Sequence, residues 1–136
     1  MDASTYLNFN GQCEEAFTFY AKCFGGKVEA MMTFEGMPDG SGIPAEWKKK
    51  IMHAHLNIGS TAILGSDAPP PHYNKPQGYS VALNTDTVEN AERIFKDLSE
   101  GGTVTMAMSE TFFAPRFGQV TDRFGIPWMV LCNGPA

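Results

Sequence analysis

Two histidines stand two residues apart in the segment MHAHLNIG, which spans residues 52 to 59. His53 and His55 alternate there with small or apolar residues, which predicts a β-strand with one polar and one apolar face. Two imidazoles on one strand face can bind a metal ion if a third ligand lies nearby. They can equally line a polar pocket or lie in solvent, and the sequence leaves these three alternatives open. The candidates for a third ligand are Asp67, His72 and Glu110.

Glu110, in the segment SETFFAPRFG, is the second candidate for chemistry. Phenylalanines follow it closely, and an apolar environment can turn a carboxyl group into a general acid or base. The alternative is that Glu110 pairs with Arg116 at a turn between strands. Both interpretations stay open at this point.

Composition limits the class of protein. The chain has 136 residues, of which 43% are hydrophobic and 18% charged, so we expect one domain with a sizeable core. A net charge of −5 argues against nucleic acid as a partner, and no apolar run is long enough to predict a membrane span. Three cysteines, an odd number, argue against a disulfide framework and favour the cytoplasm.

An internal repeat appears when the chain is aligned with itself at an offset of 76 residues. The identities fall in short segments, and each half also carries the same order of predicted elements. The matched pairs are Leu7 with Leu83, Asn8 with Asn84, Phe19 with Phe95, Gly25 and Gly26 with Gly101 and Gly102, Val28 with Val104, and Met32 with Met108.

Each half is predicted to be a βαβββ module. Alternation and helical periodicity predict a strand, a helix and then three strands in the order TYLNF, QCEEAFTFYAKCF, KVEAMMTF, IMHAHLNI and TAILG. The second half repeats this order with YSVALNT, a helix, TVTMAM, FGQVTD and PWMVLC. Asp86, with Glu89 three residues later, resembles a capping box at the start of the second helix.

The predicted fold is therefore a single α+β domain of two βαβββ repeats that form a cupped mixed sheet. The modules cover about 1–66 and 78–136, and a proline-rich linker, 67–77, joins them. A helix covers one face of each small sheet, so we expect the other face to be covered by the second repeat or by a second chain. This arrangement predicts a cleft between the repeats and a homodimer.

Three phrases in the sequence carry a resemblance to a known family. They are NGQCEEAFTFY after the first strand, ETFFA, and FGQVTDRFGIPWM near the end. Together with the paired modules, they resemble the vicinal oxygen chelate superfamily, which includes glyoxalase I, bleomycin-resistance proteins, fosfomycin-resistance enzymes and extradiol dioxygenases. The chain is most similar to the PhnB-like branch of this superfamily, over essentially its whole length.

The resemblance also implies where a metal would bind. Metal-using members place His or Glu ligands on the first and last strand of each repeat. The matching positions here are Thr5, Leu64, Ser80 and Met129, and Met129 stands where metal-using relatives have a glutamate. These side chains are poor ligands for a divalent ion, so we predict no metal site at these positions and no cofactor.

Two classes of function follow. The first is a metal-independent binder of a small molecule in the cleft, with a ligand pocket formed by His53, His55, Phe113, Arg116, Trp128 and Met129. The second is a divergent lyase, isomerase or oxygenase that uses a metal or acid and base residues, with Glu110, His53 and His55 as the candidates. The sequence alone does not decide between binder and enzyme, nor does it identify the ligand.

Overall fold

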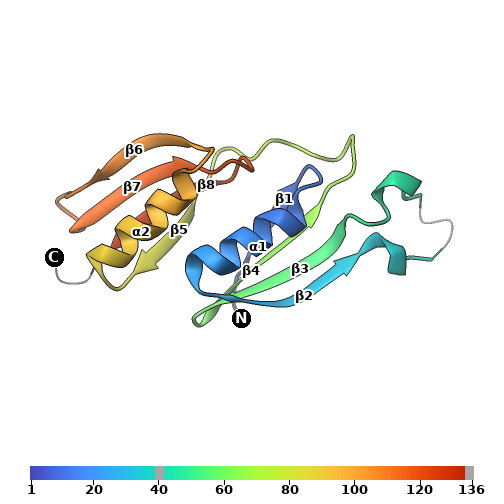
Figure 1. Cartoon of the computed structure of the whole chain (residues 1–136), viewed down its shortest axis with the longest axis horizontal. Coiled ribbons are helices and arrows are strands. Elements are labelled where there is room, and N and C mark those ends of the chain that lie inside the picture. The colour runs from blue at the N-terminus through green and yellow to red at the C-terminus, as the bar shows by residue number, and fades with distance from the viewer. Residues whose placement is uncertain (39–41, 134–136) are drawn as a thin grey trace. The chain divides into compact units, whose positions relative to one another are not determined.

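The protein is described here from a computed structural model, which places residues 1–38 and 42–133 (Figure 1). The chain divides into two compact units, Met1–Asn74 and Lys75–Ala136. Within the placed residues, neither α-helix has the length and apolar character that a membrane crossing requires.

Unit 1 contains one α-helix and a four-stranded sheet with the strand order β1-β4-β3-β2. Strands β1 and β4 are parallel, and the other two neighbouring pairs are antiparallel. The elements are β1 (Thr5–Phe9), α1 (Cys13–Phe24), β2 (Lys27–Thr33), the short 3-10 helices η1 (Phe34–Gly36) and η2 (Ala45–Trp47), β3 (Ile51–Ile58) and β4 (Thr61–Asp67). Strand β4 thus includes Asp67, the first residue of the predicted linker.

Unit 2 repeats this topology with the strand order β5-β8-β7-β6, again with the first pair parallel and the others antiparallel. Its elements are β5 (Val81–Thr85), α2 (Val88–Ser99), β6 (Thr103–Ser109), β7 (Arg116–Thr121) and β8 (Pro127–Cys132). The two βαβββ modules and the α+β fold class predicted from the sequence are therefore confirmed.

Helix α1 packs on one face of the unit 1 sheet. The apolar residues that alternate along β1 and β3, including Leu7, Phe9 and Leu56, are buried beneath it. Gly65 on β4 allows a close approach, because a Cβ atom there would lie 2.8 Å from the Phe17 ring. The residues that alternate with these buried ones along the strands lie on the other face of the sheet.

The glycine pairs of the repeat have the same two roles in both units. Gly25 and Gly101 follow the helices with φ of 71° and 70°, a left-handed conformation that glycine adopts readily. Their neighbours Gly26 and Gly102 have no room for a side chain, because a Cβ atom would lie 2.5 Å and 2.4 Å from a backbone carbonyl oxygen of the adjacent strand segment. Both glycines of each pair are therefore required by the geometry of the helix-to-strand turn.

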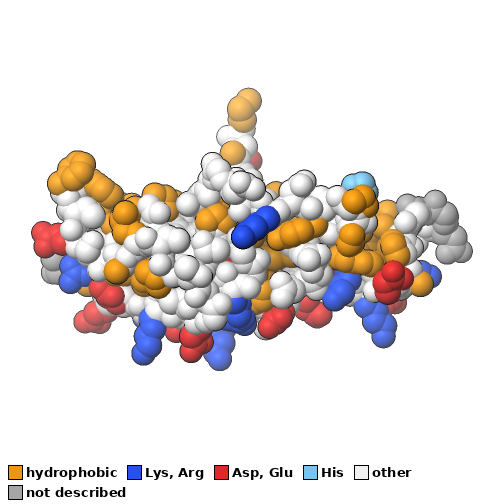
Figure 2. Space-filling view, turned by 90° about the horizontal axis from the view of Figure 1, so that it is seen from above, with side chains coloured by type: hydrophobic (Ala, Val, Ile, Leu, Met, Phe, Trp, Pro, Cys, Tyr) orange, Lys and Arg blue, Asp and Glu red, His pale blue; other side chains and the backbone are white. Residues whose placement is uncertain are grey.

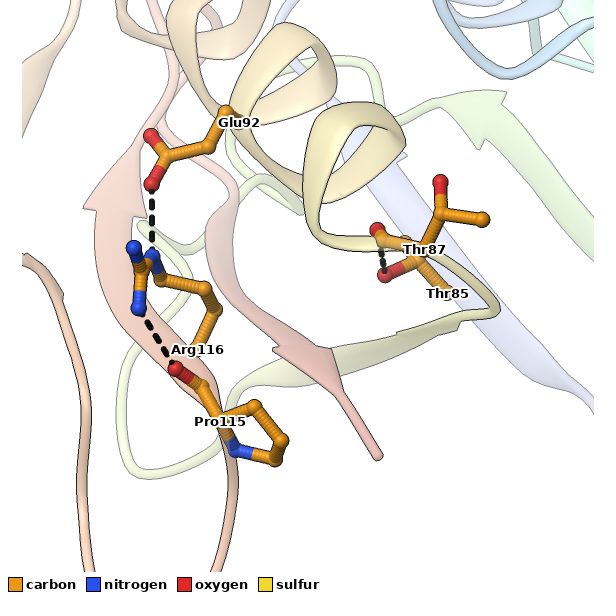
Figure 3. Close-up of polar contacts among 5 residues, drawn as sticks. All are labelled: Thr85, Thr87, Glu92, Pro115 and Arg116. Atoms are coloured by element: carbon orange, nitrogen blue, oxygen red, sulfur yellow. Dashed lines mark hydrogen bonds and ion pairs between the residues drawn. The ribbon is translucent and has the colours of Figure 1, made fainter. Parts of the chain in front are cut away.

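The start of α2 differs from the prediction. Its N-cap is Thr87, whose Oγ1 accepts a hydrogen bond from the Asn90 backbone N–H at 3.1 Å, so Asp86 is not the capping residue. Thr85, on the preceding strand, donates from its hydroxyl to the Thr87 carbonyl oxygen at 3.4 Å (Figure 3). The Thr87 hydroxyl thus caps α2 in place of the Asp86 carboxylate.

Candidate ligand-binding face of the first sheet

His53 and His55 lie on β3 and point away from α1. Ala54 and Leu56 are fully buried on the helix side, whereas both histidines are only partly buried. The alternation of a polar and an apolar strand face, predicted from the sequence, is therefore confirmed. We call the side of this sheet that faces away from α1 the open face of sheet 1. It carries Tyr6, Asn8, Met32, His53, His55, Asn57, Ala62, Leu64 and Ser66.

Each imidazole has a polar neighbour. The Tyr6 hydroxyl lies 3.4 Å from His53 Nδ1, and the two ring centroids are 6.0 Å apart. His55 Nε2 lies 2.9 Å from Asn57 Oδ1, and because an amide oxygen only accepts, the histidine donates this bond. Both rings are thereby oriented by side chains that carry no charge.

Strand register places these residues in two rows across the sheet. In the first row, Leu64 pairs with Tyr6 on one side and with His55 on the other. In the second row, Asn8 pairs with Ser66, and extending the pairing of Ala54 with Gly65 by one residue puts His53 opposite Ser66. Met32, which is 46% exposed, pairs with His53 at the outer strand.

Tyr6 was missed by the sequence reasoning as a site residue. The signal was present, because Tyr6 and Asn8 alternate in TYLNF with Leu7 and Phe9, which are buried under the helix. The same alternation that placed the histidines on one face of β3 therefore also places Tyr6 on the open face.

The three candidate third ligands lie in different parts of the chain. Asp67 is on the helix side, where Oδ1 accepts from the Cys13 N–H and Oδ2 from the Ile51 N–H, each at 2.9 Å. His72 is exposed in the proline-rich segment, and Glu110 belongs to unit 2. Among the residues that the structure describes, no three or more His, Cys, Asp or Glu side chains are grouped so as to hold a metal ion.

The strand register gives the neighbours of the positions that the family resemblance implies, Thr5, Leu64, Ser80 and Met129. Thr5 pairs with Ile63, so the β1 residue beside Leu64 is Tyr6. In unit 2, Val81 pairs with Trp128, and the β5 residue beside Met129 is Ala82, two residues after Ser80. A phenol, two apolar side chains and a thioether are not the donors that a divalent ion prefers, so the residues at these positions do not fit the metal that the resemblance implies.

Glu110 does not have the surroundings that its proposed role needs. The residue follows the end of β6 and is exposed, so the apolar environment expected around it is absent. Arg116 does not pair with Glu110 in this structure. Its Nε donates to Glu92 Oε1 on α2 at 3.0 Å, and its NH1 donates to the Pro115 carbonyl oxygen at 2.9 Å (Figure 3).

The other predicted pocket residues are in unit 2, and one of them is a core residue. Trp128 is fully buried, and its indole N–H donates to Asp122 Oδ2 at 2.8 Å, so it does not line a surface pocket as predicted. Met129 is the next residue along β8, so its side chain lies on the other face of the sheet, where it is partly exposed. Phe113 is 51% exposed and packs edge-on against Phe117, with ring centroids 5.1 Å apart.

Large apolar side chains are exposed in both units, and Figure 2 shows hydrophobic side chains at the surface, with charged ones gathered mainly along one margin of the view. On the open face of sheet 1 these are Tyr6 and Met32, which are 44% and 46% exposed. In unit 2, Met106 and Phe113 are exposed to a similar degree. Such side chains offer apolar contact to a ligand or a partner.

Cys13, at the start of α1, is a packed thiol. It is fully buried, and this burial raises the pKa of the thiol far above its ordinary value, with the nearby Asp67 and Glu14 carboxylates raising it further. A thiol held in its protonated form is a poor nucleophile and a poor metal ligand. Cys13 therefore belongs to the core and not to a reactive site.

Comparison with known proteins places the chain among relatives of the same length. Residues 5–130 match the family model described as Glyoxalase/Bleomycin resistance protein/Dioxygenase superfamily. The protein YjdN of Escherichia coli K12 is 35% identical over 138 aligned positions, which cover 96% of this chain and 94% of YjdN.

Two solved structures extend the comparison. The protein PA1353 of Pseudomonas aeruginosa is 46% identical, with a TM-score of 0.88 and coverage of 99% of both chains. A PhnB protein from Bacillus cereus is 20% identical, with a TM-score of 0.76 and coverage of 97% of this chain and 99% of that one, which shows the fold alone.

Proposed function

Since the chain belongs to the glyoxalase/bleomycin resistance protein/dioxygenase superfamily, as its sequence predicted, we propose that it binds a small organic molecule without the help of a metal ion. The observation that carries this proposal is the open face of sheet 1, where His53 and His55 stand side by side between polar and apolar neighbours. Ligand sites combine such apolar surface with a few placed polar groups.

The polar groups of this face are prepared for hydrogen bonding. Tyr6 and Asn57 orient the two imidazoles, which restricts their rotation before a ligand arrives. Met32 and Leu64, beside them, supply apolar contact area. A ligand with one polar end and an apolar body therefore fits the chemistry of this face.

The donor set supports the proposed independence from metal. The positions where the family resemblance implies metal ligands carry Thr5, Leu64, Ser80 and Met129, and the strand register puts Tyr6 beside Leu64 and Ala82 beside Met129. None of these residues carries a carboxylate or an imidazole. In the part of the chain that the structure describes, no carboxylate joins the histidine pair to make a metal-ligand group, and both Asp67 oxygens accept backbone hydrogen bonds on the other side of the sheet.

An acid and base enzyme is the second candidate function, and the contact between Tyr6 and His53 favours it. A hydroxyl 3.4 Å from an imidazole nitrogen is close to the geometry in which a proton can be shared. In such an enzyme, His53 acts as general base or acid toward the bound molecule, and Tyr6 orients the imidazole ring of His53. Turnover of a bound compound, lost in His53→Gln, would distinguish enzyme from binder.

The proposal includes a homodimer in the cytoplasm. Unit 2 exposes the apolar side chains of Met106 on β6 and of Phe113 in the loop that follows it, which a second copy would cover. The cysteines Cys13, Cys23 and Cys132 are free and buried, as in proteins of reducing compartments. Light scattering that gives a monomer mass at micromolar concentration would contradict the dimer.

The test is a thermal-shift screen of small metabolites against protein that has been treated with a chelator. We expect at least one compound to raise the melting temperature of the wild type and of His72→Ala, but not of His53→Ala. His72→Ala is the matched control, because His72 is an exposed histidine of the proline-rich segment. Stabilisation that vanishes with the chelator and returns with a divalent metal would show that binding is metal-dependent and refute the proposal.

A further inference from the structure

The open face of sheet 1 has an uneven distribution of charge. The strands of unit 1 contain two acidic residues, Glu29 and Asp67. Asp67 is buried on the helix side, where both of its oxygens accept backbone hydrogen bonds. Glu29 lies at the irregular position of the outer strand and pairs with Lys27 at 3.7 Å. The strands therefore provide one carboxylate close to the histidines, that of Glu29, whose neighbour Ala30 pairs with His55 and whose charge Lys27 offsets.

The titratable groups near the histidines are a phenol and an ion pair. From β1 the titratable group is Tyr6, and from β2 it is Lys27, which pairs with Asn57 in the strand register and is accompanied by Glu29. Strand β4 contributes only Ala62, Leu64 and Ser66 to this face. The hydrogen-bond donors of this face are therefore not opposed by an unpaired carboxylate from the strands of unit 1.

Hydrogen-bond donors also form a row across this face. His53, Ser66 and Asn8 are on three adjacent strands, which are about 4.8 Å apart in a sheet. The oxygens of a carboxylate or a phosphate accept bonds from such donors, and these bonds are stronger than those to a neutral oxygen. The apolar side chains of Met32 and Leu64 border the row.

We propose that the molecule bound at the open face of sheet 1 is an organic anion, with a carboxylate or phosphate group on the histidine, serine and asparagine row and an apolar body against Met32 and Leu64. This inference rests on the proposed function, because it specifies the ligand class of the same site. The oxygens of the anion accept the hydrogen bonds that this row of donors offers.

A dependence on pH follows from this arrangement. Histidine gains its proton between pH 8 and pH 5, whereas tyrosine and lysine keep the same charge over this interval. An anion therefore binds more tightly at pH 6 than at pH 8, and a neutral ligand of the same shape does not. The direction is set by the histidines, because the carboxylates of the unit 1 strands are committed elsewhere.

The experiment follows the ring nitrogens of the three histidines by NMR while benzoate, phenyl phosphate and the neutral benzamide are added at pH 6 and pH 8. We expect benzoate or phenyl phosphate to shift the signals of His53 and His55 but not those of His72. The affinity should fall about tenfold from pH 6 to pH 8, the factor that one charge-assisted hydrogen bond supplies. The two anionic probes distinguish a carboxylate site from a phosphate site.

The variants His53→Gln and His55→Gln keep a hydrogen-bonding side chain and remove the titration. Each should weaken anion binding at pH 6 about tenfold and flatten its dependence on pH, whereas His72→Gln should change neither. Circular dichroism checks that the variants are folded.

Three results would overturn the inference. In the first, benzamide binds as tightly as benzoate, with no effect of pH. In the second, the NMR signals of His72 shift as much as those of His53 and His55. In the third, anion binding survives both glutamine substitutions. The first of these would leave metal-independent binding intact. Failure of the proposed function itself would appear in the metabolite screen, as the absence of any compound whose effect depends on His53.

Discussion

Asp67→Asn is expected to lower the free energy of unfolding by about 2–4 kcal/mol. In the wild type, the two carboxylate oxygens accept one hydrogen bond each, from the Cys13 and Ile51 N–H groups at 2.9 Å, and the residue is 3% exposed. An asparagine keeps one acceptor and turns an NH2 group toward the other N–H. Hydrogen bonds to a charged group contribute about 1.5–3 kcal/mol, and a buried donor without a partner costs about 1–3 kcal/mol.

Urea unfolding followed by circular dichroism measures this loss, and amide hydrogen exchange locates it. The Cys13 and Ile51 amides should exchange faster in Asp67→Asn, because both donate to the altered side chain. Asp86→Asn is the matched control, since Asp86 is exposed and does not cap α2, and its effect should stay within about 0.5 kcal/mol.

A change below about 0.5 kcal/mol in Asp67→Asn, with unaltered exchange at the two amides, would refute the structural role of Asp67. A second outcome would be equally informative. If the wild type holds a stoichiometric metal that Asp67→Asn loses, Asp67 is a ligand, and the assignment of its oxygens to the Cys13 and Ile51 amides is wrong.

The remaining predictions concern the helix start, the buried thiol and the exposed glutamate. Thr87→Ala should cost about 1 kcal/mol in urea unfolding, whereas Asp86→Ala should be near neutral, because Thr87 makes the capping bond. Burial, with a smaller contribution from Asp67, raises the pKa of Cys13 above its ordinary value of 9.0. The unfolded thiol then ionises before the folded one, so stability is full below about pH 9 and falls above it by up to about 1.4 kcal/mol per pH unit. Unfolding at pH 8, 9 and 10 should show a shallower fall in Cys13→Ala. Glu110→Gln should leave ligand-induced thermal stabilisation unchanged, because Glu110 is exposed; a lost response would restore it as a site residue.

Strand faces were predictable where the two faces differ in chemistry. In β3, histidine and asparagine alternate with alanine, leucine and isoleucine, so the pattern alone shows that His53 points away from Leu56. In β8 every residue of PWMVLC is apolar, and the pattern does not say which parity is buried. Trp128 was therefore placed on a pocket although it belongs to the core, where Asp122 accepts its N–H.

The strand register and the tertiary environment of single residues could not be predicted from the sequence. A shift of one residue between parallel strands exchanges the two faces, and the sequence did not indicate that Tyr6, rather than Thr5, is the neighbour of Leu64. Glu110 has phenylalanines near it in sequence, yet burial depends on segments that are distant in sequence, and none of them covers it enough to exclude solvent. Asp86 and Thr87 are both good capping residues, and the choice between them follows from the strand geometry before α2.

The repeat indicates which positions are constrained by folding and which by function. Gly25 and Gly26 recur as Gly101 and Gly102 because the turn leaves no space for another residue type. The open faces differ instead, since the row Tyr6, Leu64 and His55 corresponds to Ala82, Met129 and Gln119 in unit 2. The same backbone thus folds with a glutamine where unit 1 has His55, which is why the fold of His55→Gln should be preserved. The module therefore does not require a histidine at position 55, which agrees with the proposed role of His55 in ligand binding.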